Sequence, residues 1–324
     1  MHKKDISRHI LIALIFLVLI MLPAIIHGQP FLLHMVIMSG VYIILAASLR
    51  LVYLGNMWLV GPTAFYGMGA YGILLLTRET TLSYWLCLPL VGIGVAVIAL
   101  GFGYITLRVK GIYFAILSIA FIEVMRLIYV NTLGSHQMLT IPPPDRISIT
   151  NLLTIDFSSK VDYYYLILLL VIISLVILYR IERSEVGGCL HALTQNEFLA
   201  ESIGIKVMWY QVLALCVCAF FVSIAGSFFA PYNQTISPES FTVGASMIIL
   251  IYMVVGGIGS FWGPIIGAIL LTIVPEYLPV DPFAQKLIYA TLVILTLYFL
   301  PAGLMSLPQV IQDKIKRNKL SYDQ

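Results

Sequence analysis

Long unbroken runs of apolar residues fill this chain, and they limit the folds that it can adopt. Several runs reach the roughly 20 residues that an α-helix needs to cross about 30 Å of hydrocarbon. Only 10% of the 324 residues are charged, whereas a soluble domain carries about 25% charged residues. A membrane β-barrel would instead show alternating segments of about 10 residues. The sequence therefore predicts an all-α polytopic membrane protein.

The apolar runs predict about eight to ten transmembrane helices. The predicted spans are residues 10–27, 31–53, 57–77, 83–107, 111–131, 162–181, 208–230, 242–256, 262–280 and 284–300. Because the connections at 54–56 and 257–261 are short and rich in glycine, the segments beside them either cross the membrane or re-enter it. The first run follows basic residues, as a signal peptide does. It is long for one and is not followed by a small-x-small cleavage site, so we expect a retained span.

Lysine and arginine are unevenly distributed along the chain, and their bias indicates its orientation. Cytoplasmic loops of membrane proteins carry an excess of these residues. Most of the Lys and Arg residues, including Arg50 and Arg180, lie on the same side of the membrane as the two termini. The excess of positive charge therefore places both termini in the cytoplasm. It places the segment 183–206 there as well, and the loop 132–161 outside. We expect a transmembrane domain over residues 1–305 and a basic cytoplasmic tail over 306–324.

The segment RSEVGGCLHALTQNEFLAESIGI, residues 183–205, is polar but keeps a helical pattern. Its apolar residues recur at steps of three, four and seven, which places them on one face of a helix. These residues are Val186, Leu190, Leu193, Ala200 and Ile203. Such a helix either docks onto a protein outside the membrane or lies flat on lipid. A helix that lies on lipid usually carries more Lys and Arg on its polar face, so the pattern favours docking.

Glu123 and Arg126 are ionisable residues inside the predicted span 111–131. They are three residues apart and can pair on one helix face. Charges at this depth are costly and mark functional candidates. A zwitterion such as a free amino acid needs an acid for its ammonium and a base for its carboxylate, which Arg binds bidentately. The pair therefore either lines a substrate pathway, with Asn131 at its outer mouth, or orders the helix bundle.

Small residues predict the places where helices pack closely. Gly259, Gly263 and Gly267 form two consecutive GxxxG steps, and Ala99 with Gly103 forms a further small pair. In lipid, such grooves let two backbones approach. The glycine-rich connection that leads into Gly259 is expected to be a tight turn at an interface, with a flexible break near a gate as the alternative.

Motifs for chemistry are absent from the sequence. It contains no GxxxxGK[ST] phosphate-binding loop and no HExxH zinc motif. No catalytic residue, metal site or disulfide is predicted, and no loop is long enough to be an enzyme domain. We therefore expect a transport protein whose energy source lies on another chain.

Four stretches of the chain together carry a family resemblance: VGPTAFYGMGAY at 60–71, the run from Arg108 to Asn131, residues 187–205, and the run from SPESF to VVGGIGSFWG at 237–263. They resemble the permease subunits of ABC importers for branched-chain amino acids, in particular the M-type subunit. In the polar segment the resemblance is carried by Gly187, Ala192, Leu193, Glu197 and Gly204. Gly188 and Thr194–Asn196 depart from the family, which usually has an Arg and more charge there.

The resemblance implies a permease whose segment 183–205 couples to cytoplasmic ATPases. Its implied partners are a second, related permease subunit in a heterodimer, two ATP-binding subunits and an extracytoplasmic binding protein. ATP would bind on those partner subunits. No cofactor and no nucleic acid is expected to bind this chain. The implied location is the inner membrane of a bacterium or archaeon. Two alternatives stay open: a permease for urea or short amides, and a secondary transporter, which would need no docking helix.

Overall fold

The computed structural model of the chain describes residues 29–80, 82–109, 111–133 and 159–277 almost completely. It also describes residues 18, 21–23, 139–140, 147–150, 153–155, 287, 290–291, 293–296, 298 and 303–306. Most of the predicted spans 10–27 and 284–300, and the tail beyond residue 306, lie outside the described residues.

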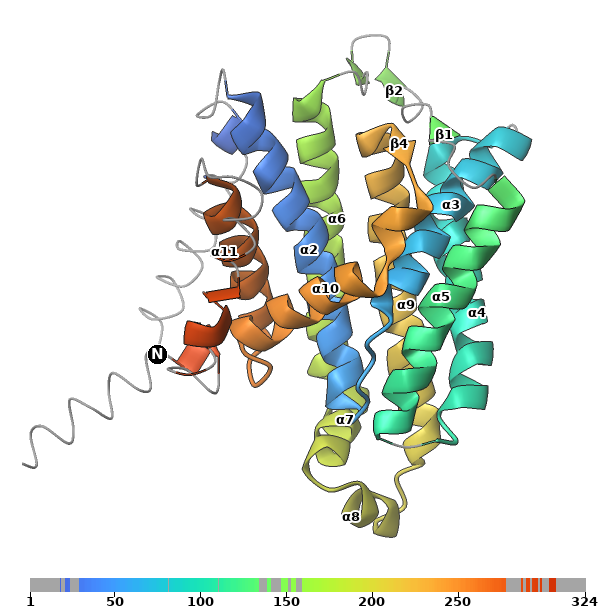
Figure 1. The fold of residues 1–324 in the computed structure, drawn as a ribbon, viewed down its shortest axis with the longest axis vertical. Coiled ribbons are helices and arrows are strands. Elements are labelled where there is room, and N and C mark those ends of the chain that lie inside the picture. The colour runs from blue at the N-terminus through green and yellow to red at the C-terminus, as the bar shows by residue number, and fades with distance from the viewer. Residues whose placement is uncertain are drawn as a thin grey trace, which may run out of the picture.

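The described chain is a bundle of long apolar helices (Figure 1). The bundle helices are α2 (Pro30–Leu54), α3 (Pro62–Glu79), α4 (Tyr84–Thr106), α5 (Ile112–Leu133), α6 (Lys160–Glu182), α9 (Val207–Asn233), α10 (Val243–Gly256) and α11 (Gly263–Tyr277). Among them α2, α4, α5, α6 and α9 are long and apolar enough to cross a membrane, and α10 and α11 are shorter. The prediction of an all-α polytopic membrane protein is confirmed.

Short strands and short helices lie at opposite ends of this bundle (Figure 1). At one end β1 (Leu139–Thr140) pairs with β4 (Thr235–Ile236), and β2 (Ile147–Thr150) pairs with β3 (Leu153–Ile155). The loop predicted at 132–161 thus contains short strands. At the other end α7 (Glu185–Gln195) and α8 (Glu197–Ser202) connect α6 to α9. We refer to this second end as the α7–α8 end.

The predicted span 57–77 is helical only from Pro62 onward. Proline is favoured in the first turn of a helix, where its missing N–H is not needed. The preceding residues 57–61 are not helical, and the backbone N–H of Val60 donates to Ser118 Oγ at 3.1 Å. Ser118 lies nearly two turns into α5. Non-helical backbone at membrane depth is tolerated only where protein covers it, and Leu59 and Val60 are indeed buried.

Helices α3 and α10 both begin in the interior, where their first turns meet. The Thr63 and Ser246 hydroxyls are hydrogen-bonded, and the backbone N–H of Thr63 donates to Ser246 Oγ at 3.2 Å. The Thr63 hydroxyl also contacts the Thr242 carbonyl at 3.3 Å. Just before α10, a 3-10 turn spans Pro238–Phe241. These contacts satisfy polar groups that two interrupted helices would otherwise leave unpaired.

Glycine contacts hold α10 against α11, as the small-residue pattern predicts. A side chain built on Gly267 would lie 2.8 Å from the Cα of Gly256, and one on Gly256 would lie 2.6 Å from the carbonyl carbon of Gly263. Gly259 differs, because a Cβ added there would have nothing within 4 Å. The prediction of close packing is therefore confirmed for Gly263 and Gly267 and is wrong for Gly259, which lies in the turn before α11.

Candidate functional site

The polar segment predicted as one helix consists of two helices that meet at Asn196. This residue is extended, with φ −162° and ψ 109°, and its side chain accepts a hydrogen bond from the backbone N–H of Leu199 at 3.1 Å. An Asn side chain that caps a new helix in this way competes with continuation of the old one. The expectation of a single amphipathic helix over 183–205 is therefore wrong, and the segment bends at Asn196.

Helix α8 and the residue that follows it carry large apolar side chains that are mostly exposed. Phe198 is 83% exposed, Leu199 64% and Ile203 71%. The helical pattern predicts Ile203 on the buried face, but the bend at Asn196 turns it outward. We call Phe198, Leu199 and Ile203 the α8 patch. Three large apolar side chains gathered on one short segment at the end of a bundle are typical of an interaction site.

The inner face of α7 is fixed to the bundle. Leu190 and Leu193 are fully buried. Thr194 Oγ1 donates to the carbonyl of Leu54 at 2.5 Å, and Gln211 Nε2 donates to the carbonyl of Gly55 at 2.9 Å. The last carbonyls of a helix have no partner within the helix, so α7 and α9 together satisfy the end of α2.

A tight turn at residues 183–184 joins α6 to α7, and Gly187 in the first turn of α7 packs against the end of α6. A side chain at this position would lie 2.6 Å from the Cα of Glu182 and closer still to the Glu182 carbonyl oxygen. Gly188, the next residue, is exposed, and a Cβ added to it would have nothing within 4 Å. The absence of a side chain at Gly187 therefore lets α7 fold directly back against the end of α6.

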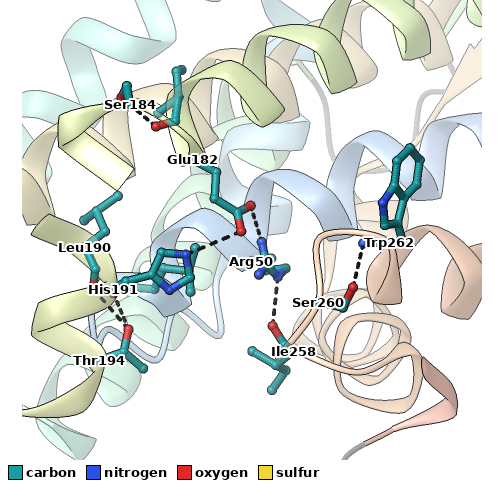
Figure 2. A network of polar contacts seen from close by, with 11 residues as sticks. Arg50, Glu182, Ser184, Leu190, His191, Thr194, Ile258, Ser260 and Trp262 are labelled. Carbon is teal, nitrogen blue, oxygen red and sulfur yellow. Dashed lines mark hydrogen bonds and ion pairs between the residues drawn. The ribbon is translucent and has the colours of Figure 1, made fainter. Parts of the chain in front are cut away.

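An ionic network around the buried Arg50 connects this turn to the rest of the bundle (Figure 2). Arg50, on α2, is 3% exposed and forms an ion pair through Nη1 with Oε2 of Glu182. Its Nε donates to the carbonyl of Ile258 at 2.8 Å. The other carboxylate oxygen of Glu182 lies 3.5 Å from Nε2 of His191 on α7. The network thus brings together α2, α6, α7 and the turn between α10 and α11.

The predicted coupling residues lie on different sides of the α7–α8 segment. Gly187 and Leu193 are buried, Ala192 is partly buried, and Gly204 is exposed with φ +91°. Glu197 is partly exposed and lines a cavity of about 120 Å³. The remaining residues around this cavity are Asn56, Met57, Trp58, Leu107, Val109, Gly111, Phe114 and Gln211. Gly187 and Leu193 therefore pack on the inner side of the α7–α8 segment. Glu197 lies at the cavity between this segment and the neighbouring turns.

Glu123 and Arg126 pair on the outer face of α5, with 2.8 Å between Oε2 and Nε. Their side chains are 43% and 32% exposed, and Asn131 is also exposed. The structure brings the first two together, as their spacing predicts. The opposite face of α5 lines an apolar pocket of about 670 Å³ between α3, α4 and α5, which includes Tyr71 and Tyr129. The charged pair and this pocket are thus separated by the helix itself.

Comparison with known proteins agrees with this architecture. The family model described as the permease component of branched-chain amino acid transport systems matches residues 31–299. The chain belongs to this family. The permease is 31% identical over 297 residues to the high-affinity branched-chain amino acid transport system permease protein LivM of Escherichia coli, with 84% of this chain and 70% of the relative covered. It is 30% identical over 311 residues to the LivM protein of Salmonella typhimurium, with 89% and 72% covered. No solved structure matches the chain.

Sequence reasoning about the permease missed Arg50 and Glu182. The charge bias groups Arg50 with the cytoplasmic residues, although it lies inside the predicted span 31–53 and is followed by Leu51 and Val52. The position of Arg50 inside a span could have identified it, because an ionisable residue within a span is a functional candidate. No sequence pattern identifies its partner, since Glu182 is 132 residues away in the chain.

Proposed function

We propose that this chain is the membrane-spanning subunit of an ATP-driven importer for branched-chain amino acids, and that its ATPase partner docks on the α8 patch. The family supports a transport permease, and the α8 patch is the observation that carries the docking site. Exposed apolar side chains beside the acidic Glu201 suit a protein partner better than anionic lipid, which would attract Lys and Arg.

The proposed assembly contains two permease subunits, this one and a related partner, with two ATP-binding subunits on the cytoplasmic side. An extracytoplasmic binding protein delivers the amino acid to the opposite end of the bundle. The Lys and Arg bias supports placing the α7–α8 end and both termini in the cytoplasm of a bacterium or archaeon. ATP binds on the partner subunits, and this chain contributes the pathway.

In this proposal the importer works as a bistable bundle. Closure of the ATPases around ATP displaces α7 and α8, and the bundle changes the side to which its pathway opens. The loaded binding protein biases the same equilibrium from the other end, because each ligand shifts it by its differential affinity for the two states. Glu123 and Arg126 lie on the proposed pathway, where they would hold the ammonium and the carboxylate of the substrate, with Asn131 at the outer mouth.

The docking site is tested by Phe198→Asp in the complete transporter. Because this change places a charge in the α8 patch, we expect at least tenfold weaker binding of the ATPase subunits, with the permease still folded. The control is Leu82→Asp, which alters an exposed apolar residue between α3 and α4, at the end of the bundle opposite α8. Equal ATPase binding by both variants would refute docking at the patch.

The substrate is tested separately by purifying the associated binding protein and measuring which amino acids or amides it binds. We expect leucine, isoleucine and valine. A binding protein that bound only urea would refute the branched-chain assignment and leave the ATP-driven mechanism intact. Both LivM relatives are described as branched-chain amino acid permeases, which favours the first outcome.

A further inference from the structure

Arg50 is a buried cation at the junction of four elements. It is 3% exposed and has two separate partners, the Glu182 carboxylate and the Ile258 carbonyl. A buried guanidinium is tolerated only when it is paired and hydrogen-bonded. The two bonds leave from different nitrogens, Nη1 and Nε. The planar guanidinium therefore fixes the distance and the direction between the end of α6 and the turn that precedes α11.

Glu182 extends this contact to the α7–α8 end. One carboxylate oxygen binds Arg50 and the other faces His191 on α7. The backbone of the same residue lies against Gly187, so α7 cannot move toward α6 without displacing Glu182. Any force applied to α7 thus acts directly on the partner of Arg50.

The other partner of Arg50 belongs to a closely packed turn. Gly257, next to Ile258, has φ +110°. A side chain on Gly303 would lie 2.5 Å from the Gly257 nitrogen, so a second segment packs on this turn. At its far end α10 binds the start of α3 through Ser246 and Thr63. Displacement of the Ile258 carbonyl is therefore expected to move α10 as a unit, and with it the interior start of α3.

We propose that Arg50 is the positioning residue that transmits movement of α7 and α8 to the α10–α11 turn. This inference rests on the proposed function and assigns a specific side chain to the coupling step. Arg50 touches neither the α8 patch nor the pathway residues Glu123 and Arg126 in the structure, so it acts through Glu182 and Ile258. Through Arg50, α7 and the α10–α11 turn change position together, so that nucleotide and substrate shift the same conformational equilibrium.

The test compares Arg50→Met with Arg180→Met in the complete transporter, reconstituted in vesicles with its ATPases and binding protein. Arg180 lies in the last turn of α6 and is exposed, so its replacement removes the same charge near the same end. We expect Arg50→Met to lower the uptake per ATP hydrolysed at least tenfold. Arg180→Met should change this ratio less than twofold.

Arg50→Lys tests the same proposal if the Met variant fails to assemble. Lysine retains the charge beside Glu182 but lacks the planar fork that reaches two partners at once. We expect it to assemble and to lower the uptake per ATP about threefold. An assembled Lys variant with the wild-type ratio would overturn the proposal.

A distance measurement separates transmission from general stabilisation. Spin labels at Gln195→Cys, on the exposed end of α7, and at Gly259→Cys, beside Ile258, are placed in a background in which the four native cysteines are replaced. In the wild type we expect one narrow distance, equal in the nucleotide-free and ATP-trapped states. In Arg50→Met the distance should broaden and differ between the states.

An unchanged distance distribution in Arg50→Met would overturn the proposal, because the two elements would then be held together by other contacts. This outcome concerns Arg50 alone. The proposed function is refuted by a different result, namely a wild-type complex that binds its ATPases without ATP-dependent uptake.

Discussion

Replacing Gly187 with alanine is expected to lift α7 off the end of α6. The new Cβ would lie 2.6 Å from the Cα of Glu182, whereas an ordinary contact needs at least 3.4 Å. The two backbones must therefore separate by about 0.8 Å or more, and the even closer carbonyl oxygen of Glu182 increases this distance. Backbone atoms cannot rotate away as the end of a flexible side chain can.

Gly188→Ala is the matched control for this change. It introduces the same methyl group one residue later in the same helix, where nothing lies within 4 Å. Alanine is favoured over glycine inside a helix by about 0.5–1 kcal/mol. The control should therefore stabilise α7, and Gly187→Ala gains the same helix propensity but loses about 1–3 kcal/mol through overpacking. We expect α7 docking to differ by about 2 kcal/mol between the two variants.

Hydrogen exchange of the α7 backbone amides measures this difference, because local opening of one segment sets their exchange rate. A difference of about 2 kcal/mol corresponds to about 30-fold faster exchange in Gly187→Ala than in Gly188→Ala. The amides of α9 should exchange alike in both variants. Equal α7 exchange in the two variants would refute the reasoning, since it would mean that the contact between Gly187 and Glu182 relaxes without undocking the helix.

Three further changes test other parts of the molecule. Glu197→Arg reverses the charge beside the 120 Å³ cavity. We expect lower uptake per ATP hydrolysed, with the spans still folded. Normal uptake with normal ATPase binding would count against a coupling role. Arg126→Met removes the proposed partner of the substrate carboxylate. Because hydrogen bonds to charged groups contribute about 1.5–3 kcal/mol, the KM for uptake should rise about tenfold or more. An unchanged KM would mean that Arg126 only pairs with Glu123. Gly226→Ala places a methyl group 3.0 Å from the Tyr66 carbonyl carbon and should lower the free energy of unfolding by about 1–3 kcal/mol. Gly101→Ala, with nothing within 4 Å, should not lower it in the same denaturation measurement.

Most of the fold follows from local sequence patterns. Helices α4, α6 and α9 begin and end within a few residues of the predicted spans, because length and hydropathy are properties of each segment alone. The predicted start of α3 is wrong, since the apolar run continues back to residue 57 while the chain is not helical before Pro62. A backbone N–H in that non-helical stretch donates to the Ser118 hydroxyl, which another helix supplies.

The candidate site was only partly predictable for the same reason. The family resemblance located the α7–α8 segment, and spacing alone paired Glu123 with Arg126, since three residues along a helix bring two side chains together. The outward direction of Ile203 depends on the bend at Asn196, because one uninterrupted helix would have placed Ile203 inside. A polar residue that is neutral within a helical pattern thus decided which side chains are available to a partner.

The sequence by itself determined that the chain enters a membrane, approximately where its helices lie, and the transport family to which it belongs. Apolar length and local motifs carry this information, because each is complete within one stretch of chain. Only the tertiary structure decided that Arg50 binds Glu182 and the Ile258 carbonyl. These partners are 132 and 208 residues away, and a buried charge is paired by whichever groups packing brings within reach.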